Sequence, residues 1–207
     1  AGTFVKSLDC STADLRVAQH ERFNILKNVP ASTASMRFAS AVARAPGYEQ
    51  AVAELVAGLH EGLAGARPDL VCLFASVHHE SAWLSLAEHV RRAFAGALLF
   101  GCSARSVIGA AQEIEEAPGV AACAASLPGV TLHPFHVGTN GVPALPGPDH
   151  AHVLLLVDPF RADLDALLPA LDERFPAGRK LGGIASGAAR PGGNLLFLGE
   201  GALRTGA

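Results

Sequence analysis

Two stretches of this sequence combine glycines with polar side chains of the kind that small-molecule sites use. The first is 100-FGCSARSVIG-109 and the second is 182-GGIASGAARPGG-193, and each follows an apolar run. Backbone N–H groups, hydroxyls and guanidinium groups can together bind a small polar molecule, and Asp158 is the most conspicuous acid nearby. The candidate ligand-binding residues are Gly101, Cys102, Ser103, Arg105, Asp158, Gly182, Gly183, Ser186 and Arg190.

The glycines of both stretches indicate a backbone conformation or a close approach that a residue with a side chain would not allow. Glycine at the carboxyl end of a parallel strand permits a positive φ, or lets a neighbouring backbone or a ligand come close. In open α/β sheets, ligands bind at the carboxyl ends of the strands. We therefore expect a cleft where the strands that precede the two stretches end.

Two other chemistries for these stretches are less well supported. Cys102 could be a nucleophile, but such catalysis needs a base that the sequence does not place nearby, so we expect a buried thiol and no enzymatic activity. A phosphate loop is disfavoured because neither stretch contains the Gly-Lys-Ser/Thr ending, and the run after each is extended rather than helical.

The cysteines and histidines do not predict a metal site. The four cysteines are widely spaced, and Cys72, Cys102 and Cys123 lie in apolar runs, where we expect small buried side chains in a reducing compartment. His78 and His79 diverge on regular backbone, as do the histidines at 133 and 136. We expect neither a metal nor another cofactor.

The elements that would position the candidate residues follow from hydrophobic periodicity. A short extended piece after Met36 precedes the first helix, and Pro134 directs one strand toward a sheet edge. Helices are predicted at 47–63, 80–94 and 162–175, and strands at 70–76, 97–103, 119–126, 130–137, 151–157, 179–185 and 193–199. Strands 119–126 and 130–137 are expected to pair antiparallel, and the strands that flank helices 80–94 and 162–175 to pair parallel.

The two β-α-β segments match one another at a constant offset. Moving the first by 81 positions places Leu73 on Leu154 and Gly101 on Gly182 without a gap. This predicts an α/β fold of mixed sheets, built from two β-α-β-β repeats related by internal duplication, with helices packed on the sheets. The alternative is that any two β-α-β units share such periodicity. The predicted organisation is an extension at 1–35, a first repeat at 36–137, a Gly/Pro linker at 138–150 and a second repeat at 151–207.

Composition and charge exclude several classes of function. The chain has 207 residues, of which 50% are hydrophobic, and a net charge of −3, so no basic surface for nucleic acid is expected. Its apolar runs are far shorter than the roughly 20 residues that span a bilayer. Residues 1–35 carry no initiator Met and one predicted helix at 13–29, which could dock on a partner. We expect a soluble intracellular protein, cytoplasmic or, if the amino terminus is processed, located in a chloroplast or mitochondrion.

The order of several motifs resembles the amino-terminal domain of FIST proteins over about residues 36–199. The motifs are MRFASAVA (36–43), PDLVCLFAS (68–76), FGCSARSVIG (100–109), QEIEE (112–116), SLPGVTLHPFHV (126–137), LLVDPF (155–160), LDERFP (171–176) and GGIASG with RPGGNLLFLG (182–199). The last block is the most specific of them. The resemblance implies an intracellular sensory module of signal transduction that binds a small ligand such as an amino acid.

The resemblance also implies that this chain differs from a typical FIST protein at its carboxyl end. A FIST protein continues into another strand and a partner domain, so the second repeat is expected to be truncated here. The alternative function is a non-catalytic accessory or scaffold subunit of a larger assembly, possibly organellar. A protein partner could then bind through the amino-terminal helix and the truncated edge.

Overall fold

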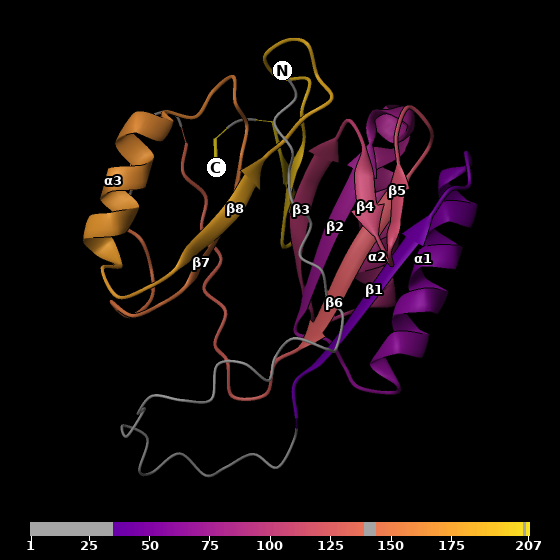
Figure 1. Ribbon diagram of the computed structural model, residues 1–207, viewed down its shortest axis with the longest axis horizontal. Helices are drawn as coiled ribbons and strands as arrows, with labels where there is room; N and C mark the ends of the chain where they lie inside the picture. Colours follow the sequence, from indigo (N-terminus) through magenta and orange to yellow (C-terminus); the bar gives the residue numbers. More distant parts are fainter. Residues whose placement is uncertain (1–34, 139–143, 205) are drawn as a thin grey trace.

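The structure is a computed structural model that describes residues 35–138, 144–204 and 206–207. The helix predicted at 13–29 lies outside the described residues. Within them, none of the helices is long and apolar enough to cross a membrane. The described residues form an α/β fold with one large mixed sheet and two small sheets (Figure 1).

The large sheet contains six strands in the order β1-β6-β2-β3-β9-β10. Only β2 and β3 are parallel, and every other neighbouring pair is antiparallel. The strands are β1 (Arg37–Ala43), β2 (Leu70–Ser76), β3 (Leu98–Ala104), β6 (Val120–Ser126), β9 (Leu196–Leu198) and β10 (Gly201–Leu203). The mixed sheet predicted from the sequence is therefore present.

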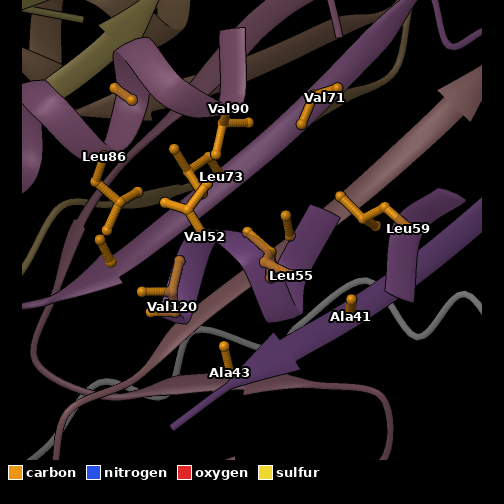
Figure 2. Packing of buried hydrophobic residues seen from close by; sticks show 14 of the residues in the cluster. Ala41, Ala43, Val52, Leu55, Leu59, Val71, Leu73, Leu86, Val90 and Val120 are labelled. Carbon is orange, nitrogen blue, oxygen red and sulfur yellow. The ribbon is translucent and has the colours of Figure 1, made fainter. Parts of the chain in front are cut away.

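Two helices cover one face of this sheet. Helix α1 (Tyr48–Leu63) buries residues three and four apart, and α2 (Trp83–Ala93) follows a 3-10 turn, η1 (Val77–Ala82), and buries Trp83, Leu86 and Val90. Alternate residues of β2 and β6 complete the same apolar core, which is the expected period of two for strands with one face under helices. Figure 2 shows Leu55, Leu73 and Val90 converging there from α1, β2 and α2.

A second β-α-β unit packs on the other side of the large sheet. It consists of β7 (Val153–Val157), α3 (Leu164–Arg174) and the parallel strand β8 (Lys180–Ile184). Asp163 caps α3 by accepting a hydrogen bond from the Ala166 N–H at 3.1 Å. Leu167, Leu171 and Phe175 form its own core with β7. Figure 1 shows α3 on the opposite side of the large sheet from α1.

The two units meet through a small apolar cluster. Cys102 of β3 and Leu196 of β9 contact Leu156 of β7 and Ala185, which follows β8. All four side chains are buried. The carboxyl ends of β3 and β7 are thereby held next to one another, which is the arrangement that a site shared by both units requires.

Several details differ from the sequence prediction. The strand predicted at 130–137 is wrong: these residues form no strand, because both edges of β6 are already occupied by β1 and β2 and Pro134 has no N–H to donate. Strands β4 (Val107–Gly109) and β5 (Gln112–Ile114) form a hairpin that was not predicted. Strand β9, assigned to the second repeat, pairs with β3 of the first unit.

The structure does not show an internal duplication. Both units contain parallel strands joined by a helix, as predicted, but their strand registers differ by one residue. Leu73 lies opposite Gly101, whereas Gly182 lies opposite Leu155 rather than Leu154. A one-residue shift exchanges the faces of a strand, so the constant offset of 81 does not superimpose the two pairs of strands.

Gly101 and Gly182 nevertheless occupy positions of the same kind, where a carbonyl oxygen of the neighbouring strand leaves no room for a side chain. A Cβ on Gly101 would lie 1.8 Å from the Leu73 carbonyl oxygen, and a Cβ on Gly182 would lie 1.9 Å from that of Leu155. Neither glycine has a positive φ. Of the sequence-based explanations, the close approach of a neighbouring backbone is therefore the one that applies.

We predict that Gly101→Ala destabilises the protein by about 2 to 3 kcal/mol, because the added methyl group forces β3 away from β2. Gly182→Ala should cost less, since β8 pairs on one side only and can shift. Urea unfolding measures both values. Gly138→Ala is the matched control, because a Cβ on Gly138 would meet nothing within 4 Å; equal stability of Gly101→Ala and this control would contradict the steric account.

Candidate functional site

The candidate site is a cluster of buried polar side chains where β3, β7 and β9 come together. Ser103 lies near the carboxyl end of β3, Asp158 directly follows β7, and Asn194 lies two residues before β9. Their exposed fractions are 0%, 1% and 1%, respectively. Because buried polar groups are costly unless they are hydrogen-bonded, the bonds of this cluster determine what it can do.

The side-chain amide of Asn194 joins the other two members. Its Nδ2 donates to Asp158 Oδ1 at 3.1 Å, and its Oδ1 accepts from the Ser103 hydroxyl at 3.5 Å. The same Oδ1 accepts from the Ala188 N–H at 3.2 Å, while Ser103 Oγ accepts from the Leu195 N–H at 3.1 Å. Asn194 therefore connects the two sheets and the loop between β8 and β9.

Asp158 has one oxygen that this network leaves unsatisfied. Its Oδ1 is bonded to Asn194, but its Oδ2 is buried and has no hydrogen-bond partner among the described residues. Its backbone N–H donates to the Gly206 carbonyl at 2.9 Å, which fixes the main chain of Asp158, while the bond from Asn194 orients the carboxylate. An unsatisfied buried acceptor costs about 1 to 3 kcal/mol, and it marks the position in the cluster that can take a further donor.

Ser186 ties the loop after β8 to the end of β3. Its Oγ accepts from the Arg105 N–H at 3.1 Å, and its N–H donates to the Ser103 carbonyl at 3.2 Å. Arg105 and Arg190 are exposed on these two loops. The loops that carry the two guanidinium groups are thus joined beside the buried cluster.

The structure places some of the predicted site residues in or beside the polar cluster. The others lie in the strands that lead to it or in apolar surroundings. Ser103, Asp158 and Ser186 form or border the cluster, and Arg105 joins it through its backbone. Gly101 of β3 and Gly182 of β8 each lie close to a carbonyl oxygen of the neighbouring strand. Gly183 of β8 lies opposite Leu156 of β7. These three glycines shape the strands that lead to the polar cluster.

Cys102 lies in apolar surroundings and is not part of the polar cluster. Cys72 and Cys123, which the sequence predicted to be buried as well, are only partly buried. Its side chain is 3% exposed and lies in the apolar cluster with Leu156, Ala185 and Leu196. Burial raises the pKa of the Cys102 thiol to about 12, so the thiol stays protonated near neutral pH. A protonated thiol is a poor nucleophile, which agrees with the buried position expected from the sequence.

Sequence reasoning missed Asn194. The available signal was a polar residue directly before the apolar run LLFL, at a point where the chain enters a buried strand. An amide there must be hydrogen-bonded, and its partners come from segments 36 and 91 positions away along the chain. Periodicity within one segment cannot reveal such a partner.

A second buried side chain with an unsatisfied polar atom lies in η1, which follows β2. His79 is 2% exposed and its Nε2 has no hydrogen-bond partner in the described part of the chain. Burial, with a smaller contribution from neighbouring His78, lowers the pKa of His79. Across the described ranges, no group of three or more His, Cys, Asp or Glu side chains could hold a metal ion.

Comparison with known proteins identifies a family and relatives of greater length. The family model that matches residues 69–207 is that of the FIST N domain. An uncharacterized protein of Mycobacterium tuberculosis strain H37Rv is 32% identical over 177 residues, which cover 83% of this chain and 46% of the relative. An uncharacterized protein of Mycobacterium bovis is 28% identical over the same shares of both chains. The chain spans about half the length of the curated relatives it matches.

We predict that Asn194→Leu lowers the free energy of unfolding by about 3 kcal/mol. The substitution leaves the buried Asp158 Oδ1 and the partly buried Ala188 N–H without these partners, and the loss at a buried group costs about 1 to 3 kcal/mol. Gln50→Leu is the control, because Gln50 is an exposed amide on α1 with one surface hydrogen bond. If both variants unfold at the same urea concentration, Asn194 does not hold the two units together.

The raised pKa of Cys102 predicts a specific pH dependence. In the folded state the thiol has a pKa of about 12 against an ordinary value of 9.0. The unfolded chain therefore releases this proton at lower pH, so the stabilisation is complete below pH 9 and is lost as the pH rises toward 12. Relative to Cys102→Ala, the wild-type protein should lose up to about 1.4 kcal/mol per pH unit in this range.

Urea unfolding between about pH 8 and pH 11 measures this difference. Near pH 8 the folded protein should also leave Cys102 unlabelled by iodoacetamide, and the same thiol should be labelled after denaturation. Parallel stability curves for the two proteins, or rapid labelling of Cys102 in the folded state, would contradict the assigned environment.

Proposed function

Since the chain belongs to the FIST N domain family, a family of sensory and signalling domains, we propose that it is a module that binds a small molecule carrying an ammonium and a carboxylate group, such as an amino acid. The ligand's ammonium group binds Asp158 Oδ2. Its carboxylate binds Arg105 and Arg190. The proposed role is binding rather than catalysis.

The observation that carries this proposal is the unsatisfied Oδ2 of Asp158. A carboxylate oxygen that is buried without a donor is suited to a cation, because a charge-assisted bond from an ammonium group offsets the cost of desolvation. The Asn194 bond to Oδ1 fixes the orientation of the carboxylate before the ligand arrives. A preorganised acceptor of this kind favours specific binding over loose ion pairing.

The arginines supply the complementary charge. Arg105 and Arg190 follow β3 and β8, and the hydrogen bond between the Arg105 N–H and Ser186 Oγ holds their loops side by side. Neither guanidinium group makes an ion pair within the described ranges, whereas Arg91, Arg92 and Arg174 each pair with an acid. Guanidinium groups are well suited to carboxylates because they can donate two parallel hydrogen bonds.

The loop of residues 185–194 controls access. Asp158 is 1% exposed, so a ligand reaches it only when this loop moves. The loop rests closely on η1: a Cβ on Gly187 would lie 2.2 Å from Val77 Cγ1. Since Asn194 leads from the loop into β9 of the large sheet, occupancy at Asp158 is transmitted to both units, which is what a sensory domain requires.

The proposal predicts that an amino acid ligand raises the thermal midpoint of the protein. Individual amino acids are screened by differential scanning fluorimetry, and a ligand present at 100 times its Kd stabilises the folded state by about 2.7 kcal/mol. The N-acetyl derivative of an active amino acid should give no shift, because it has no ammonium group for Asp158. Its amide, which lacks the carboxylate, should bind more weakly.

Two variants test the assigned groups. Asp158→Asn keeps the acceptor for Asn194 but replaces Oδ2 with an NH2 group, so it should fold and lose the ligand response. Asp165→Asn changes an exposed acid at the start of α3 and should respond as the wild type does. Absence of any response across the amino acid panel, or an unchanged response of Asp158→Asn, would overturn the proposal.

A further inference from the structure

A buried histidine lies where the chain passes from β2 to α2. His79 is part of η1, its side chain is 2% exposed, and its Nε2 has no hydrogen-bond partner among the described residues. A neutral imidazole carries a proton on only one ring nitrogen, whereas an imidazolium carries an N–H on both. Protonation of His79 therefore places a charge in the interior and leaves the Nε2–H without an acceptor.

The side chains around η1 do not compensate such a charge. The acids on η1 and on the segments packed beside it are exposed or paired: Glu80, Glu115 and Glu116 are exposed, and Glu88 bonds to Arg92. The other titratable groups there are bases and thiols, namely His78, His89, Arg91, Arg92, Arg105, Arg190, Cys72 and Cys102. Burial and, to a smaller extent, His78 hold the pKa of His79 below its ordinary value of 6.5.

The same turn supports the loop that covers the candidate site. Gly187, in the loop of residues 185–194, lies against Val77 of η1, since a Cβ on Gly187 would be 2.2 Å from Val77 Cγ1. Gly187 has a φ of +103°, which favours glycine. The next residue, Ala188, donates its N–H to Asn194 Oδ1. The closed position of the loop therefore depends on where Val77 lies as well as on the polar cluster.

The two ends of η1 are fixed, so its middle is the part that can move. Before it, Ser76 Oγ accepts a hydrogen bond from the Gly119 N–H at 3.0 Å. After it, the buried side chain of Trp83 donates from its indole N–H to the Ser76 carbonyl at 3.0 Å. Val77 and His79 lie between these anchors, and His79 has non-helical backbone angles. A displacement of His79 is thereby passed to Val77, two residues away.

We propose that protonation of His79 opens the loop of residues 185–194, so that access to Asp158 responds to pH. The ring takes a proton from solvent and leaves its buried position to hydrate the new charge. Val77 moves with it, and Gly187 loses the surface against which it rests. The closed loop is thus stabilised by the neutral form of His79.

The direction of the pH dependence follows from the lowered pKa of His79. The open form has the ordinary pKa of 6.5 and the closed form a lower one. Opening is therefore independent of pH above this ordinary value, and below it becomes more favourable by up to about tenfold per pH unit. The effect levels off once the pH falls below the pKa of the closed form.

The consequence for a ligand rests on the proposed function. A ligand that enters and leaves only through the open loop exchanges faster in proportion to the open population. Its Kd changes little as long as the closed form predominates, because association and dissociation are accelerated equally. Acid therefore controls the rate of access rather than the affinity.

The test is amide hydrogen exchange of the ligand-free full chain at about pH 7.5 and about pH 5.5, corrected for the intrinsic effect of pH on exchange. Peptides that cover 77–82 and 185–194 should be up to about tenfold less protected at the lower pH, and peptides of α1 should be unchanged. Histidine NMR spectra of the same protein should show His79 titrating below the exposed histidines. Since no ligand is present, these results do not depend on the proposed function.

Variants assign the effect to His79. His79→Gln keeps a polar side chain but does not titrate, and His79→Phe is an apolar replacement in case His79→Gln folds poorly; in both, loop protection should be the same at the two pH values. His150→Gln alters an exposed histidine outside both segments and should behave as the wild type does. Equal loop protection of the wild type at both pH values, or a pH dependence that persists in a folded His79 variant, would overturn the proposal.

The link to ligand access has a separate test. With an amino acid that binds, stopped-flow association and dissociation rates should rise by the same factor as loop opening does between the two pH values. Rates that stay constant while the loop opens would overturn the link to access. A panel without any binding amino acid would contradict the proposed function and leave the exchange result to decide the switch.

Discussion

The side-chain amide of Asn194 is the interaction on which the arrangement of the two units depends. One amide binds the carboxylate that ends β7 and the hydroxyl near the end of β3, and it also accepts the Ala188 N–H. All of this occurs in a region from which water is excluded, where each bond is stronger and each unmade bond is more costly than at the surface. The polar network therefore fixes how the second unit sits on the large sheet.

The apolar contacts around this network explain why it stays buried. Cys102, Leu156, Ala185 and Leu196 close the space between β3 and β7, and the glycines of β3 and β8 let neighbouring strands approach without a side chain between them. The carboxylate of Asp158 is thus enclosed with one oxygen satisfied and one open. A cationic hydrogen-bond donor is therefore favoured at Oδ2 and not at Oδ1. This is the basis of the proposed selectivity for an ammonium group.

The sequence predicted the parts of this structure that depend on local patterns. The apolar periodicity of α1, α2 and α3 is visible in the sequence, as are the runs that form β2, β3, β7 and β8. Ser103, Asp158 and Ser186 could be predicted because they lie at or just after the carboxyl ends of β3, β7 and β8. Asn194 was missed because its partners are distant in the chain. The pairing of β6 with β1 and β2, rather than with 130–137, was missed for the same reason.

The predicted repeat shows the limit of periodicity as evidence. The helices of the two units correspond at an offset of 81, since α2 spans 83–93 and α3 spans 164–174. The strands do not, because register depends on hydrogen bonds between strands and on side-chain packing, and Gly182 lies opposite Leu155. The same dependence on register placed Cys72 opposite Cys123, a pairing that spacing along the chain does not indicate.

The most direct test is a crystal structure of the protein grown with the amino acid that gives the largest thermal shift. The account predicts electron density for that molecule beside Asp158, with its nitrogen about 2.8 Å from Oδ2 and its carboxylate toward Arg105 and Arg190. A single water-sized peak at Oδ2, with the amino acid bound elsewhere or not at all, would contradict it.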